Sequence, residues 1–151
     1  MIEDWIDNLA KTWAFAVNNF QTVRSIRIIE STDFPASINP SGDFPLAMTM
    51  PLGMGASYAA SGSVLHWTGE THFHVAPNLE NTSMPSLPKW YGKILTAAAG
   101  NITLNGKVTN FGIPDETDAI RLEALQYGNE AEHWGFTVRW FVTESARITV
   151  A

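Results

Sequence analysis

The segment from Val64 to Val75 holds the side chains best spaced for chemistry. His66, Glu70, His72 and His74 occupy alternate positions along it, so in an extended strand they would share one face. His72 and His74 would then present two imidazoles about 7 Å apart at Cα, which is close enough to bind one metal ion. Two imidazoles alone do not complete a metal site, so the surrounding residues decide whether this is a ligand set or a polar strand face.

The His-x-His spacing is similar to that of the cupin family, in which a glycine precedes the first histidine by several residues and a glutamate soon follows the second. Here Gly69 stands too close to His72, and Glu80 lies beyond Pro77. We therefore predict a solvent-facing strand whose polar face carries histidines, with no bound metal and no cofactor. A His-x-His metal enzyme is kept as a third hypothesis for the function.

His133 stands beside Glu130 and Glu132 in a region expected to form a turn. A histidine next to a carboxylate can act as a general base. A single histidine among acids is far more often a surface residue, however, and we predict that place for His133, without a catalytic role.

Asp115, Glu116 and Asp118 follow Pro114, but they lack the Asp-x-Asp-x-Asp-Gly spacing of a calcium-binding loop. The chain also contains no Gly-x-Ser-x-Gly sequence and no phosphate-binding loop. We expect a solvated acidic loop here and a protein that is not an enzyme.

An uncharged stretch runs from Phe44 to Gly69, and its first part alternates large apolar residues with small or hydroxylic ones. This pattern is typical of an extended segment with one apolar face. Methionine-rich surface adapts well to partners, so we predict that this arm, within an excursion over about residues 34–63, contacts another subunit. The candidate contact residues are Phe44, Leu46, Met48, Met50, Leu52 and Met54. The alternative is an internal β-hairpin that covers the chain's own core.

The elements that would position these residues begin with an amphipathic helix at Ile2–Phe20, whose apolar residues recur at helical spacing. The β-branched run Val23–Ile29 predicts a strand. A mobile turn is expected over the small residues of Gly53–Ser63. The extended segment Val64–Val75 is then either one long strand or a folded pair.

A second helix is predicted at Leu87–Ala99, with Ser86 as its N-cap and Gly100 at its C′ position. Tryptophans fall on the apolar sides of the predicted elements, and we expect at least four of the six in the core. The six tryptophans are Trp5, Trp13, Trp67, Trp90, Trp134 and Trp140.

The remainder of the chain has the pattern of β-structure. Ile102–Thr109 contains Asn105-Gly106, the strongest short-range signal of a hairpin in the sequence. Alternating residues predict two antiparallel strands over 119–127 and 134–144. The sequence therefore predicts one α+β domain over residues 1–151, with a mainly antiparallel sheet, two amphipathic helices on one of its faces and a long extended arm.

The composition excludes several classes of protein. The 151 residues include nine basic and 15 acidic side chains, a net charge of −6, which is unsuited to gripping nucleic acid through its phosphates. The absence of cysteine excludes disulfide scaffolds and thiol nucleophiles. Prolines and glycines interrupt the uncharged stretch, so no membrane-spanning helix is expected. The acidic opening Met-Ile-Glu-Asp-Trp gives no expectation of an export signal.

The order of these elements resembles that of the tail terminator proteins of long-tailed bacteriophages, also called tail-completion or neck proteins. The likeness covers nearly the whole chain and lies in element order, size and acidity. Its points are the helix Ile2–Phe20, the strand Val23–Ile29, the proline-rich excursion Phe34–Pro51, the aromatic strand Trp67–Val75, the helix Leu87–Ala99, the hairpin Ile102–Val108 and the closing strands.

The resemblance implies a homo-hexameric ring in the virion that caps the tail tube, ends its polymerisation and joins it to the head–tail connector. It would assemble in the host cytoplasm, and DNA would pass through its lumen without specific binding. Acidic residues facing the lumen would repel the DNA phosphates. The candidates are Asp115, Glu116, Asp118, Glu130 and Glu132. The resemblance supplies no catalytic residue and no cofactor.

The main alternative is a likeness to the cone-shaped α+β fold of nuclear-transport-factor-2-like proteins, which enclose a small ligand or a hydrolase or isomerase site. In that case Trp67, His72, Trp134 and Trp140 would line a pocket. The uncharged arm would then have no evident purpose.

Overall fold

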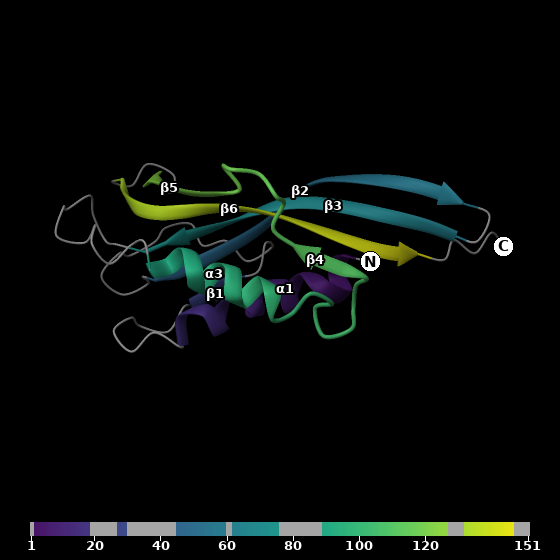
Figure 1. The fold of residues 1–151 in the computed structure, drawn as a ribbon, viewed down its shortest axis with the longest axis horizontal. Helices are drawn as coiled ribbons and strands as arrows, with labels where there is room; N and C mark the ends of the chain where they lie inside the picture. Colours follow the sequence, from purple (N-terminus) through teal and green to yellow (C-terminus); the bar gives the residue numbers. More distant parts are fainter. Residues whose placement is uncertain are drawn as a thin grey trace.

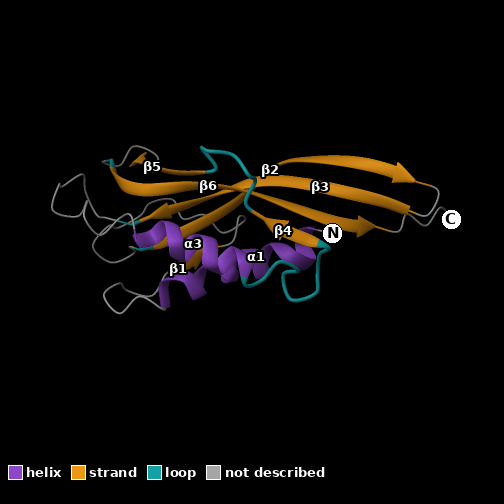
Figure 2. Cartoon of the chain, viewed as in Figure 1, coloured by secondary structure: helices purple, strands orange, loops and turns teal. Residues whose placement is uncertain are grey.

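The structure is a computed structural model that describes residues 2–18, 27–29, 45–59, 62–75, 89–126 and 132–146. Two helices lie together on one face of a twisted sheet (Figures 1 and 2). This arrangement confirms the predicted α+β class and the packing of both helices on one face.

The first helix, α1 (Ile2–Asn18), places Glu3 and Asp4 in its first turn, where the helix dipole favours acidic side chains. Its apolar side chains recur at helical spacing and pack against the sheet. Trp5, Leu9 and Trp13 are fully buried, and Ile2 and Ile6 are partly buried. The predicted helix is confirmed over these residues, and Phe20 lies outside the described part of the chain.

The second described helix, α3 (Lys89–Ala99), buries Trp90 and Ile94 beside α1. Its predicted N-cap, Ser86, lies outside the described residues. Gly100 directly follows the last residue of α3, as predicted, and its N–H donates to the Thr96 carbonyl at 3.0 Å, although its φ is not positive. The chain reverses a few residues later.

That reversal replaces the predicted hairpin at Ile102–Thr109. Leu104, Asn105 and Gly106 have φ angles of 48°, 61° and 80°, within a compact turn rather than between two strands. The side chain of Asn105 donates to Asn8 of α1 at 2.9 Å, and Leu104 is completely buried. The hairpin prediction was wrong because burial of Leu104 and bonding to α1 outweigh the local preference of Asn-Gly for a β-turn.

The longest part of the sheet is an antiparallel pair formed by β2 (Leu46–Ala59) and β3 (Gly62–His74). The single strand β3 decides between the two alternatives predicted for Val64–Val75. The mobile turn expected over Gly53–Ser63 was wrong, because a bulge between Pro51 and Gly53 lets the β2–β3 ladder continue to the end of β2.

The other strands extend the sheet on both sides. β6 (His133–Ala146) pairs antiparallel with β3, and its outer edge carries β4 (Asn110–Gly112) and β5 (Ile120–Leu125) at different heights. β1 (Arg27–Ile29) pairs in parallel with the beginning of β2. The antiparallel pairing predicted between residues 119–127 and 134–144 is confirmed.

The core lies between the sheet and the helices. The ring of Trp5 meets those of Trp140 and Trp67 edge to face, with centroids 6.0 and 5.8 Å apart. Trp13, Trp90, Trp5 and Trp140 are at most 2% exposed, so the prediction of at least four core tryptophans is confirmed. The opposite face of the sheet carries the histidines and most of the charged strand residues.

Candidate functional site

The outer edge of β2 is open along most of its length. On this outer side β1 pairs only with residues 46–48 of β2, and from Thr49 to Ala59 the only described strand beside β2 is β3, on its inner side. Residues 52–57 are all exposed, with Leu52 at 61% and Met54 at 51%. In Figure 1 the right-hand ends of β2, β3 and β6 extend past both helices. Within the described part of the chain, β2 therefore has an uncharged outer edge without a paired strand at this end, here called the open β2 edge (residues 52–59).

The predicted contact arm divides into two parts at the bulge. Leu46 and Met48 are only 1% exposed, so these two candidates belong to the interior of the chain and offer no surface to a partner. The prediction was wrong for them because β1 and β3 pair with the two sides of the beginning of β2, where both side chains are buried. Met50 is partly buried, and Phe44 lies outside the described residues. Only Leu52 and Met54 remain as exposed candidates.

An open apolar groove lies at another place on the surface, between α3 and the connection from β4 to β5. Its volume is about 410 Å³. Its apolar lining consists of Tyr91, Leu95, Ile113, Pro114, Ala119 and Ile120, and we call it the α3 groove. Asp115, Glu116 and Thr117 also line it. Sequence reasoning missed this groove, because its two walls are separated along the chain and only the fold brings them together.

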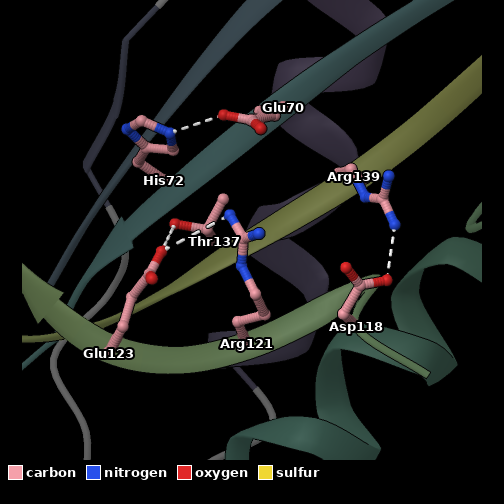
Figure 3. Close-up of polar contacts among 7 residues, drawn as sticks. All are labelled: Glu70, His72, Asp118, Arg121, Glu123, Thr137 and Arg139. Atoms are coloured by element: carbon pink, nitrogen blue, oxygen red, sulfur yellow. Dashed lines mark hydrogen bonds and ion pairs between the residues drawn. The ribbon is translucent and has the colours of Figure 1, made fainter. Parts of the chain in front are cut away.

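The acidic residues at 115–118 are exposed but not all independent. Arg139 of β6 donates to Asp118 at 2.7 Å and also forms an ion pair with Glu116, which fastens the acidic loop to the sheet (Figure 3). The prediction of a solvated loop is confirmed for the exposure of these residues. It did not include the ion pairs that two of the carboxylates form with Arg139. Asp115 is exposed at the α3 groove.

The remaining acidic candidates lie near the start of β6. Glu132 is exposed immediately before that strand. Glu130 lies outside the described residues. The structure therefore does not gather the five predicted carboxylates into one described cluster.

The histidines are the largest departure from expectation. His133, predicted at the surface, is 2% exposed, and its Nε2 lies 2.6 Å from Nδ1 of His74, which is also 2% exposed. The prediction was wrong because β3 and β6 bring together two residues that are far apart in the sequence. Burial, followed by the nearby His133 and His72, lowers the pKa of His74 to about 3.

The other two histidines fit a polar strand face better. His72 lies 3.0 Å from a carboxylate oxygen of Glu70 (Figure 3), and His66 is exposed. No three or more metal-ligating side chains among the described residues are placed to hold a metal ion. The described histidines therefore form one buried pair and one carboxylate-bound ring rather than a shared ligand set.

The pocket required by the cone-shaped alternative is not assembled from its four candidates. Trp67, Trp134 and Trp140 belong to the helix-facing side of the sheet, where Trp140 is buried in the core. His72 lies on the opposite side, since its position in β3 has the other parity.

Comparison with known proteins gives no family assignment: no protein-family model matches the chain, and no curated protein matches it. Neither described helix has the length and apolar character needed to cross a membrane. The exposed surfaces of the chain are therefore the basis for a proposal about its function.

Proposed function

We propose that this protein is a structural subunit that assembles with copies of itself into a ring, and that the ring caps a phage tail tube as tail terminator proteins do. One observation carries the proposal: the open β2 edge is long and uncharged, and its residues 52–57 are exposed. Strand edges of this kind pair readily with other chains unless they are charged, bulged or covered. The bulge after Pro51 protects only the point where it lies, so we infer that a subunit covers the rest.

The charge distribution supports this role. Each chain carries a net charge of −6, and the negative charge of a ring grows with the number of copies. A lumen lined with carboxylates would let DNA slide through without binding its phosphates. Asp115 and Glu132 are the stronger described candidates for this lining, because Glu116 and Asp118 are already paired with Arg139.

The proposed ring is a homo-hexamer in the virion, between the tail tube protein and the head–tail connector. A ligand-binding cone is the second candidate, and the four residues that favoured it lie on two faces of the sheet. We therefore favour the assembly role over the binding or catalytic role.

The proposal predicts a tube-protein gene beside this chain's gene, and it is tested with the product of that gene. We expect polymerising tubes to become shorter and to carry a ring at one end when the full chain is added, as seen by negative-stain electron microscopy. The variant Leu52→Lys with Met54→Lys should lose this effect. Ile102→Lys is a matched control, because Ile102 is a similarly exposed apolar residue (53%) on the turn after α3. Unchanged tube lengths without end rings would contradict the proposal.

A further inference from the structure

We infer that the open β2 edge of one copy binds in the α3 groove of the next copy. This inference rests on the proposed self-assembly and names the two surfaces that would make the contact. It commits the groove to one occupant, a second copy of this chain, with Leu52 and Met54 as the side chains that enter it.

Exposed apolar side chains occur at both of these surfaces. Four large hydrophobic residues in the described part of the chain are at least half exposed, and they fall into two groups. Leu52 and Met54 lie on β2, while Leu95 and Ile102 lie on α3 and the turn that follows it. Leu95 also lines the α3 groove, whereas Ile102 is not one of its lining residues. Leu52 and Met54 therefore project from a strand edge, and Leu95 borders a hollow.

The two surfaces lie on opposite sides of the sheet. The strand order places β2 on one side of the β3–β6 pair, and β4 and β5 on the other. The α3 groove is bounded by the connection between β4 and β5, so it lies on the side away from the open β2 edge. Two different surfaces on opposite sides make a heterologous contact, which closes into a ring when its rotation allows.

The outer edge of β4 is less suited to receive β2. The N–H of Phe111 in β4 donates to the Ile102 carbonyl at 2.7 Å, so the turn after α3 occupies that edge. Continuous strand pairing from β2 to β4 of the next copy is thereby blocked. The neighbouring groove, in contrast, offers apolar side chains to an incoming apolar edge.

The charges near the two surfaces also favour this contact. Asp115 and Glu116 line the α3 groove, and copies of a chain with net charge −6 repel one another unless uncharged surface meets at the contact. The chain has no charged residue from Phe44 to Gly69, so the open β2 edge enters the groove without like-charge repulsion. The flexible thioether of Met54 adapts to an open groove better than a branched side chain does.

The test uses the absence of cysteine in this chain, which makes every introduced cysteine unique. Leu52→Cys and Leu95→Cys chains are co-expressed, treated with a short bis-maleimide and separated on a denaturing gel. We expect a crosslinked dimer in the mixture and none with either variant alone. A chain carrying both substitutions should give a ladder of higher oligomers. The Leu52→Cys and Ile102→Cys mixture is the matched control and should give little product.

Each outcome either supports or overturns the inference. Dimers from Leu52→Cys alone would indicate that β2 pairs with β2 of another copy, and would overturn the groove as its partner while leaving self-assembly intact. Self-association without any of these crosslinks would also overturn the groove as the partner of β2 and leave self-assembly intact. A chain that stays monomeric at every concentration would remove the proposed self-assembly and the inference together. Met54→Cys replaces Leu52→Cys if circular dichroism shows that the latter does not fold.

Discussion

His74 and His133 lie side by side at one end of the sheet, with Nδ1 of the first 2.6 Å from Nε2 of the second. Their ring centroids are 4.8 Å apart, and both side chains are 2% exposed. One ring must donate and the other accept in this hydrogen bond, so the pair is compatible with neutral imidazoles, whereas protonation of both rings would leave no acceptor. The pair joins β3 to the start of β6.

This arrangement makes stability depend on pH. The pKa of His74 falls from 6.5 to about 3, so between these values the unfolded chain binds a proton that the folded chain does not. The free energy of unfolding should therefore increase with pH in this window, by up to about 1.4 kcal/mol per pH unit. It should decrease by the same slope as the pH falls from 6.5 towards 3. Urea unfolding at a series of pH values measures this slope.

A matched pair of variants tests whether His74 causes this dependence of the free energy of unfolding on pH. His74→Gln should flatten it, since glutamine does not titrate. His66→Gln should leave it unchanged, because His66 is exposed. An equal slope in the wild type and in both variants would show that the His74–His133 pair does not govern acid stability.

Gly69 is required by the ring of Trp140, which lies against it from the neighbouring strand. A Cβ at position 69 would overlap that ring and the carbonyl oxygen of Met50. Gly69→Ala should therefore lower the free energy of unfolding by about 3 kcal/mol. Gly55→Ala is the control, since nothing lies within 4 Å of its Cβ position, and it should change stability by less than about 0.5 kcal/mol. Chemical denaturation compares the two, and equal stabilities would contradict the packing described for Trp140.

Arg139 should hold the acidic loop in place. Arg139→Gln removes its ion pairs with Glu116 and Asp118, and we expect a loss of about 1 kcal/mol at low salt and less at high salt. Amide hydrogen exchange should become faster in residues 115–118. Arg121→Gln is the control, because Arg121 contacts Glu123 at 3.7 Å and is more exposed. A larger effect from Arg121→Gln than from Arg139→Gln would contradict this role.

The two halves of β2 should respond differently to charge. Leu52→Lys with Met54→Lys should weaken self-association at least tenfold, about 1.4 kcal/mol, while leaving the fold intact. Met48→Asp should instead destabilise the fold by about 3 kcal/mol or more, because Met48 is 1% exposed. Sedimentation and circular dichroism separate the two effects. A folded, stable Met48→Asp chain would contradict the interior position of that residue.

Local patterns predicted the elements whose side chains face one continuous core. The helical spacing of Trp5, Leu9 and Trp13 and the alternation of Phe136, Val138 and Trp140 each place apolar residues on a single buried face. Such periodicity depends only on nearby residues, so it can be read before the topology is known.

Features that depend on distant residues could not be predicted in this way. His74 and His133 are 59 positions apart, and their contact exists only because β3 pairs with β6. Asn105-Gly106 correctly indicated left-handed backbone, but contacts with α1 decided the shape of the turn. The arm over residues 44–54 has one uniform alternation of large apolar and small residues. Its first part is nevertheless buried and its last part exposed, because β1 pairs only with residues 46–48 and the bulge follows Pro51.

Native mass spectrometry of the full chain over a wide concentration range tests the proposed self-assembly most directly. We predict a single closed oligomer of six copies, which Leu52→Lys with Met54→Lys converts to monomer and which Ile102→Lys leaves assembled. A monomer at every concentration, or an oligomer that persists unchanged in the Leu52 and Met54 variant, would contradict assembly through the open β2 edge.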